Sequence, residues 1–297
     1  MERKNPSFSN LRTFIFVVII CVSCALVLSI LAELLKTPQK NAKELYRNKQ
    51  LLLAARILGY DGYFLLDGKP ATYDKEKNLL TLATDTFPSK ATNNELLTLC
   101  EIRILPRLTD KKGKIYTFQQ VGLDQQKYLL EHTKLGYAHL PYKLVYLVKE
   151  NKPSSIPYGY VLPVNGYGLW DGIYGYLGLK TDGDTLLGMT WYDQKETPGL
   201  GGEIALPAWQ EQFFNKVIFQ KSPSGTTNFE SATLGIKIVK TTVSETYGDS
   251  PISDSAVDGI PGASITVNGV SDALRTSLAP YRPFLIRAHN GEIKIDE

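Results

Sequence analysis

The sequence predicts an α+β protein with a single N-terminal transmembrane helix. Three features indicate this class: one long uncharged apolar run, a β-rich second half with Gly and Asp turn signals, and a helical apolar spacing after residue 264. Of the 297 residues, 43% are hydrophobic and 21% are charged, which allows a packed core. The net charge is only +3 without a basic block, so nucleic-acid binding is not expected.

Residues 14–32 form the apolar run, which reads FIFVVIICVSCALVLSILA. At about 1.5 Å per residue, a helix of this length crosses the roughly 30 Å hydrocarbon core of a bilayer. No A-x-A cleavage site follows, so we expect an uncleaved anchor. Cys21 and Cys24 are interpreted as small packing residues, because a reactive thiolate is disfavoured in hydrocarbon. A lipoprotein box at Cys24 is a weaker alternative, since Cys21 stands where Leu is required.

Charges beside the run do not fix its orientation. Arg3, Lys4 and Arg12 precede it, whereas five Lys and Arg residues follow within residues 36–49. This count favours a cytoplasmic C-terminal side, but long folded domains translocate largely regardless of charge.

The chain divides into five predicted regions. They are an N-terminal tail (1–13), a transmembrane helix (14–32), a membrane-proximal helix (33–59), an α+β segment that is an insertion or the N-terminal part of a soluble domain (60–150), and a domain with the candidate functional motifs (151–297). In the membrane-proximal helix, Leu51, Ala54, Ala55 and Leu58 share one face, and Gly59 is the predicted C-terminal stop.

Strands are predicted on both sides of residue 150. Residues 115–119 and 144–148 are β-rich, and residues 173–179 and 186–192 flank the turn sequence KTDGDT, which predicts a β-hairpin. Asp182 and Asp184 of this turn lack the remaining ligands of a calcium loop, so turn formation is their expected role.

The C-terminal motif VDGIPGASITVN spans residues 257–268 and precedes an apolar spacing that predicts a helix ending before Pro280. Ser264 would then lie near a helix N-terminus, either as an N-cap or beside free amides that hold a phosphate. Gly259 and Gly262 would allow close approach of a bulky group. A hydrolase nucleophile at Ser264 is a weaker interpretation, because G-x-S-x-G is missing.

The three histidines, His132, His139 and His289, show neither metal-site spacing nor an obvious nucleophile partner, so structural roles are expected. Two further segments are rich in glycine: GYGLW at residues 166–170 and ETPGLGGE at residues 196–203. The first is an incomplete nucleotide-binding fingerprint, and the second must form a shaped loop.

Together these segments resemble the C subunit of the sodium-translocating NADH:quinone reductase. The similarity rests on the words GYGLWDGIYGY, TDGDT, WYDQKETPGLGGE, PAW and DGIPGASIT in this order, and on the membrane span. Residues 60–150 contribute nothing to it. The resemblance implies a mixed α/β FMN-binding domain over residues 151–297, held outside the cytoplasm by the single anchor.

In that family a flavin transferase joins the FMN phosphate to a hydroxyl in a motif resembling D-x-x-[ST]-G-A-T. Asp258, Gly262 and Ala263 match this motif, whereas Pro261 and Ser264 depart from it, with Ser264 in the acceptor position. The resemblance therefore implies covalent FMN at Ser264, with Thr266 as the alternative acceptor. It places further flavin contacts at Gly168, Leu169, Trp170, Glu196, Thr197, Gly199 and Leu200.

The resemblance also implies electron relay through FMN within a complex of several subunits in the bacterial inner membrane, with the soluble domain on the periplasmic side. No metal and no catalysis by the isolated chain are expected. Two alternatives remain: the G subunit of the ferredoxin-linked (Rnf) electron-transport complex, and a flavin-free membrane-anchored assembly protein.

Overall fold

The computed structural model describes residues 7–83 and 89–295 and divides the chain into two units, Met1–Tyr46 and Arg47–Glu297. The first unit is occupied by most of helix α1 (Ser7–Ala54), whose side chains from residue 11 to residue 44 are exposed. Its most apolar window has a mean hydropathy of 3.2. Within the described residues, this is the one helix long and apolar enough to cross a membrane.

The membrane span and the membrane-proximal helix form one continuous helix, which ends at Ala54. The prediction that Gly59 stops this helix is wrong. Arg56 adopts a left-handed conformation with φ 53°, and the amides of Ile57 and Leu58 both bond to the carbonyl of Leu52. Ile57 and Leu58 are buried, so packing in the second unit turns the chain off the helix axis before the glycine is reached.

Six antiparallel strands form the main sheet, in the order β5-β4-β6-β7-β8-β9. Their bounds are β4 Ile104–Thr109, β5 Ile115–Tyr116, β6 Lys143–Val148, β7 Gly159–Tyr167, β8 Gly172–Lys180 and β9 Leu186–Asp193. The predicted hairpin is confirmed as β8 and β9, and the predicted strand at 144–148 is confirmed as β6. Strand β5 is shorter than predicted, because Thr117 and Gln120 exchange side-chain to amide hydrogen bonds that begin a turn.

The sheet runs through the boundary predicted at residue 150, since β6 pairs with β7 from Tyr146↔Val161 to Val148↔Gly159. Residues 60–150 therefore supply strands to the same sheet as residues 151–297. They also form a separate three-stranded sheet, of β1 (Phe64–Leu66), β2 (Lys69–Asp74) and β3 (Leu79–Leu82). A two-stranded parallel sheet pairs β10 (Lys237–Ile238) with β11 (Ala256–Val257).

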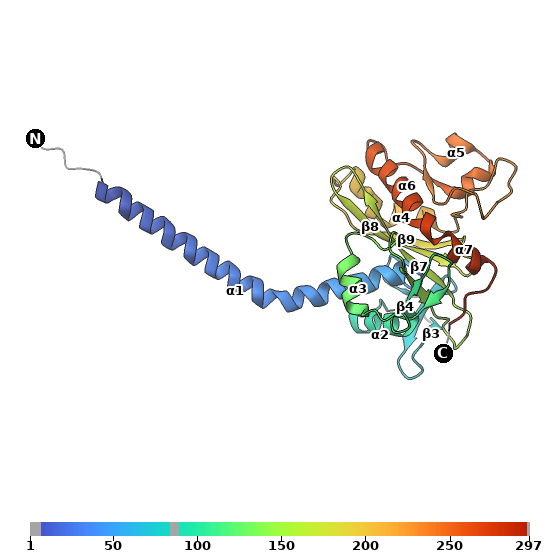
Figure 1. The fold of residues 1–297 in the computed structure, drawn as a ribbon, viewed down its shortest axis with the longest axis horizontal. Coiled ribbons are helices and arrows are strands. Elements are labelled where there is room, and N and C mark those ends of the chain that lie inside the picture. The colour runs from blue at the N-terminus through green and yellow to red at the C-terminus, as the bar shows by residue number, and fades with distance from the viewer. Residues whose placement is uncertain (1–6, 84–88, 296–297) are drawn as a thin grey trace, which may run out of the picture. The chain divides into compact units, whose positions relative to one another are not determined.

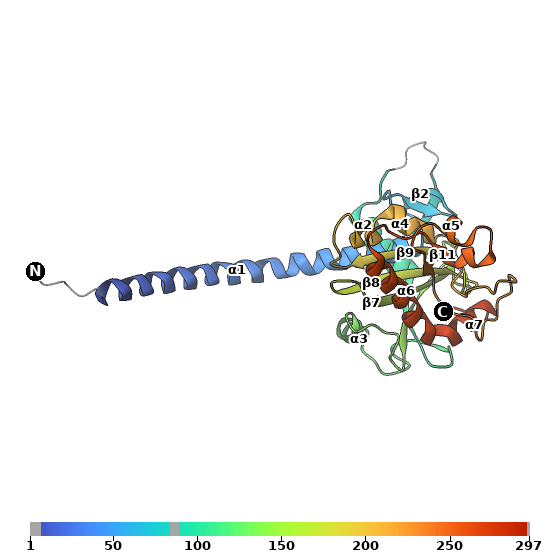
Figure 2. The same ribbon diagram turned by 90° about the horizontal axis from the view of Figure 1, so that it is seen from above.

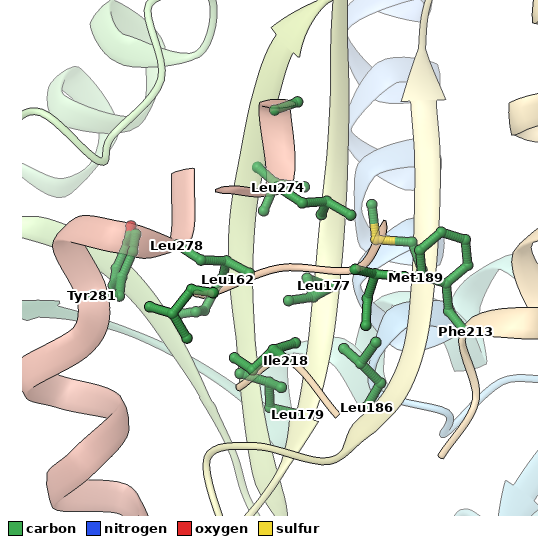
Figure 3. Packing of buried hydrophobic residues seen from close by; sticks show 14 of the residues in the cluster. Leu162, Leu177, Leu179, Leu186, Met189, Phe213, Ile218, Leu274, Leu278 and Tyr281 are labelled. Carbon is green, nitrogen blue, oxygen red and sulfur yellow. The ribbon is translucent and has the colours of Figure 1, made fainter. Parts of the chain in front are cut away.

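Helix α6 (Ser264–Leu278) packs against β7 (Figure 1, Figure 2) and confirms the predicted helix that begins near Ser264 and ends before Pro280. Figure 3 shows Leu274 and Leu278 of α6 beside Leu162 of β7 and Leu177 of β8 in the buried core. The remaining helices are α2 (Asn93–Arg103), α3 (Gln125–His132), α4 (Pro207–Gln210), α5 (Val243–Tyr247), α7 (Arg282–His289) and the 3₁₀ helices η1 (Gly201–Ala205), η2 (Glu211–Phe213), η3 (Pro251–Ser255) and η4 (Ala279–Tyr281).

Candidate functional site

The GYGLW segment is the end of strand β7 and the tight loop that joins it to β8. Tyr167 pairs with Gly172, which leaves residues 168–171 as the loop, and the amide of Gly168 bonds to the carbonyl of Asp171 at 2.9 Å. Trp170 projects outward and is 68% exposed. The amides of Leu169 and Trp170 in this short loop point toward the same acceptor.

Glu196 lies beneath this loop and joins three segments that are distant in sequence. The residue is only 5% exposed. Its carboxylate accepts hydrogen bonds from the amides of Leu169 at 3.1 Å and Trp170 at 3.0 Å, and from the hydroxyl of Thr266 in α6. Burial disfavours the charged form, but the Thr266 hydroxyl and the two amides outweigh it and lower the pKa of Glu196 below its ordinary value. The charge is therefore held by hydrogen bonds alone.

The glycines of both Gly-rich motifs make room for this carboxylate. A Cβ atom on Gly168 would lie 2.5 Å from Oε1 of Glu196, and one on Gly201 would lie 2.8 Å from Oε2. A Cβ on Gly201 would also overlap the hydroxyl of Thr266. The incomplete G-x-G pattern thus reflects close packing around an acid.

The 197–202 segment folds back on itself above α6. The carbonyl of Thr197 accepts from the amides of Leu200 at 3.1 Å and Gly202 at 2.9 Å, and its hydroxyl accepts from the indole N–H of Trp170 at 3.1 Å. Gly199 takes a φ of 77°, as this turn requires. Leu200 is partly exposed and its Cδ2 lies against Gly262, where a Cβ would come within 3.0 Å.

Ser264 occupies the first position of α6, whereas Ala263 is the N-cap and makes no side-chain capping bond. The interpretation of Ser264 as an N-cap is therefore wrong. Its side chain is exposed, and among the residues that the structure describes its hydroxyl has no hydrogen-bond partner. The amides of residues 264–266 are likewise unbonded within the described chain, as expected for a first helical turn.

Thr266 points the other way. Two helical positions are about 200° apart around the axis, so an outward Ser264 requires an inward Thr266. Thr266 is 2% exposed, and its hydroxyl is committed to Glu196.

Asp258 is tied to the scaffold on the far side of the PGA turn. Its carboxylate accepts from the amide of Val243 at 2.7 Å, its own amide donates to Gln212 at 2.9 Å, and its carbonyl accepts from the indole of Trp209 at 3.0 Å. None of its hydrogen bonds within residues 7–83 and 89–295 reaches Glu196.

The structure thus brings most of the sequence-predicted site residues together. Hydrogen bonds or direct contact connect Leu169, Trp170, Glu196, Thr197, Leu200, Gly262 and Thr266, with Gly168, Gly199, Ala263 and Ser264 beside them in the chain. Gly201 was predicted only as part of the Gly-rich loop near the flavin, and sequence reasoning missed Gly269, where a Cβ would overlap the carbonyl of Tyr167. It also missed that Glu196 is the centre of the cluster.

The histidines lie elsewhere. His289 stacks on Phe229 with ring centroids 4.0 Å apart, and His132 packs against Tyr128 at 4.9 Å. No histidine hydrogen-bonds to Ser264 in the part of the chain that the structure describes, so a Ser–His hydrolase has no structural support.

Comparison with known proteins gives a consistent assignment. Residues 168–279 match the model of the FMN-binding domain family. The chain is 40% identical over 295 residues to the C subunit of the Na(+)-translocating NADH-quinone reductase of Chlamydia pneumoniae, covering 93% of this chain and 91% of that protein. The chain belongs to the family of Na(+)-translocating NADH-quinone reductase C subunits. The C subunit of Yersinia pestis is 29% identical over 98% of this chain and 97% of its own length.

The crystal structure of the C subunit from Parabacteroides distasonis shows that this fold is shared within the family. The two structures align with a TM-score of 0.54 at 24% identity, covering 84% of this chain and 96% of that one. The matched FMN-binding region begins at Gly168 and ends at Ala279, so it includes the Glu196 cluster and the whole of α6.

Proposed function

We propose that this protein relays electrons through FMN joined to Ser264 by a phosphodiester, within a sodium-pumping NADH:quinone reductase complex. The observation that carries the proposal is an exposed, unpartnered Ser264 hydroxyl at the first turn of α6, beside three unbonded amides. Helix N-termini of this kind favour phosphate through their free N–H groups and the helix dipole.

The residues present fit FMN. The amides of residues 264–266 would hold the phosphate, and Gly262, with a φ of 78°, leaves the approach to Ser264 open. Apolar surface for a flat ring is available at Leu169, Trp170 and Leu200, which are exposed around the Glu196 cluster. Exposed apolar side chains beside a phosphate-binding turn suit a ligand that has both an apolar ring and a phosphate group.

Thr266 is the weaker acceptor for a physical reason. A hydroxyl must be accessible and free to lose its proton before it can form a new P–O bond, and Thr266 is buried and donates to Glu196. Serine supplies the same oxygen nucleophile as the threonine of the family motif, so the change at residue 264 preserves the chemistry.

Attachment requires an activated flavin nucleotide with a pyrophosphate bond. Ser264 Oγ would form a P–O bond to the flavin-side phosphorus, the pyrophosphate P–O bond would break, and a nucleoside monophosphate would leave with the electron pair. The hydroxyl proton passes to a base of the flavin transferase. The product is a phosphodiester, and no oxidant or reductant is needed.

When bound, FMN would supply one-electron acceptance and donation. The chain's own contribution is rigidity: the Glu196 carboxylate fixes the 168–171 loop to the first turn of α6 through three hydrogen bonds. Because the 168–171 loop and the first turn of α6 are held together, the environment of an attached flavin ring would stay constant between turnovers.

Helix α1 would anchor the domain in the bacterial inner membrane, with residues 47–297 on the periplasmic side, and the other subunits of the complex would be its partners. The length and exposed apolar surface of α1 support the anchor.

The test is mass analysis of the full chain expressed with its native flavin transferase. We expect an FMN mass increment on the peptide that contains Ser264, absent in Ser264→Ala and retained in the matched control Thr266→Val. Normal yield of an unmodified wild-type chain would refute covalent attachment. Co-purification with a ferredoxin-linked assembly would refute the assignment to the NADH:quinone reductase.

A further inference from the structure

A second concave site lies at the opposite end of α6 from Ser264. The helix has 15 residues and is therefore about 22 Å long. Beside Pro280, just beyond its C-terminal end, the turn after β4 and the segment 138–142 line an open cavity of about 660 Å³. This volume is within the range of small-molecule sites, and none of its lining belongs to the Glu196 cluster.

Lys143 lines this cavity as a buried cation without a partner. The residue is 6% exposed, and within residues 7–83 and 89–295 its ammonium makes neither a hydrogen bond nor an ion pair. Lys and other charged residues are almost never this deeply buried unless they are paired.

The acid in the cavity wall does not supply the missing partner. Oδ1 of Asp110 accepts from the amides of Lys112 at 2.8 Å and Lys114 at 2.9 Å, and Oδ2 accepts from the hydroxyl of Tyr116 at 3.3 Å. Asp110 is therefore occupied in closing the β4–β5 turn. Burial lowers the pKa of Lys143 and the field of Asp110 only partly opposes this.

A buried hydroxyl without a hydrogen-bond partner lies beside Lys143 on the neighbouring strand β4. Thr109 pairs with Lys143 in the β4–β6 register, so the two side chains share one face. The Thr109 residue is completely buried and its hydroxyl has no partner among the described residues. The Thr109 hydroxyl is thus a buried polar group without a partner, whereas the Lys143 nitrogen is not fully enclosed and remains accessible from the cavity.

The remaining lining divides into an apolar wall and a basic border. Leu140, Pro141 and Pro280 supply carbon surface, and the exposed Lys111 and His139 contribute basic groups. The wall would contact an apolar body, while Lys111 adds positive charge that attracts an anion.

We propose that this cavity binds a singly charged oxyanion, a carboxylate or a phosphodiester, carried on an apolar chain. The oxyanion accepts from the Lys143 ammonium, and the chain packs on the Leu140–Pro141–Pro280 wall. One unpaired ammonium in the cavity lining matches one negative charge, so neutral amphiphiles should be poor ligands. Both a fatty carboxylate and an anionic phospholipid headgroup satisfy this chemistry.

The test is calorimetric titration of the full chain in amphipol with sodium octanoate and with dihexanoyl-phosphatidylglycerol. Octanol and dihexanoyl-phosphatidylcholine serve as uncharged and zwitterionic matches, and inorganic phosphate serves as a charge without the chain. We expect saturable binding of at least one anionic amphiphile, and at least about tenfold weaker binding of all three comparison probes. Octanoate alone would identify a free carboxylate as the source, and the phosphatidylglycerol alone would identify a lipid headgroup.

Lys143→Met keeps most of the length of the side chain and removes its charge. Lys152→Met is the control at an exposed lysine that makes no hydrogen bond or ion pair within the described residues. We expect Lys143→Met to weaken binding of the anionic probe by about tenfold or more, and Lys152→Met to leave this affinity unchanged. The melting temperature of Lys143→Met should be no lower than that of wild type, because an unpaired buried charge is lost. Unchanged affinity in Lys143→Met, equal binding of octanol, or no saturable binding of either anionic probe would overturn the proposal.

Discussion

Replacing Glu196 by Gln tests whether its carboxylate holds the candidate site together. The carboxylate accepts three hydrogen bonds, from Leu169, Trp170 and Thr266. A Gln has only one acceptor oxygen, and its NH₂ would face either the Leu169 or the Trp170 amide, donor against donor. Thr266 can rotate its hydroxyl and accept from the NH₂, but one part-buried amide, of Leu169 or of Trp170, is left unsatisfied.

An unsatisfied buried amide costs about 1–3 kcal/mol, and loss of charge from the two surviving bonds costs about 1 kcal/mol each. We therefore expect Glu196→Gln to lower the free energy of unfolding by about 3–5 kcal/mol. For a unit of this size, the melting temperature should fall by roughly 6–20 °C.

The assay is thermal unfolding of the full chain in detergent, followed by tryptophan fluorescence, with Glu203→Gln as the control in the same loop. Glu203 makes no recorded side-chain hydrogen bond or ion pair within the described residues, so it should shift the melting temperature by only a degree or two. Equal melting temperatures for wild type and Glu196→Gln would refute the role assigned to this carboxylate.

Three further outcomes follow from the same contacts. Gly201→Ala should lower the free energy of unfolding in urea by about 1–3 kcal/mol, because the added Cβ would overlap the Thr266 hydroxyl. Gly202→Ala is the control and should lower it less, because its Cβ would lie 3.1 Å from the nearest atom. The pKa of Glu196 is lowered in the folded state, so the stabilisation by its carboxylate is complete above about pH 4.3 and is lost as the pH falls through the folded pKa. The urea midpoints of wild type and Glu196→Gln should therefore converge in acid. A constant difference between these midpoints down to about pH 3 would contradict this. Burial raises the pKa of Cys100 to about 12, so a maleimide should label it at pH 8 only after unfolding, as peptide mass analysis would show.

Local patterns predicted the elements whose signals are contained in one segment. The β8–β9 hairpin was readable because turn residues separate two β-rich runs, and α6 was readable from its apolar spacing and from Pro280. The position of Ser264 at a helix start followed from the same spacing. Its status as the first helical residue rather than the N-cap did not, since helix boundaries shift by one or two residues without any local signal.

Long-range contacts decided what could not be predicted. Helix α1 ends at Ala54, before Arg56 turns into a left-handed conformation. The helix end is close to β9, where a Cβ on Gly188 would lie 2.9 Å from the carbonyl of Leu53. The sheet crosses residue 150 because β6 pairs on both sides, with β4 and β7. Thr266 and Glu196 meet although 70 positions separate them, so neither motif alone reveals the bond.

In the attachment that we propose, the hydroxyls of Ser264 and Thr266 would have opposite tasks, because helix geometry points them to opposite sides. An acceptor for a bulky group must face solvent, yet the turn that carries it must not move when the group is attached. The outward Ser264 meets the first requirement, and the inward Thr266, fixed to Glu196, meets the second. Attachment to Thr266 would consume the hydroxyl that secures the turn, so one oxygen cannot perform both tasks. An exposed acceptor two positions before a buried anchor therefore suits the covalent attachment that we propose at this helix start.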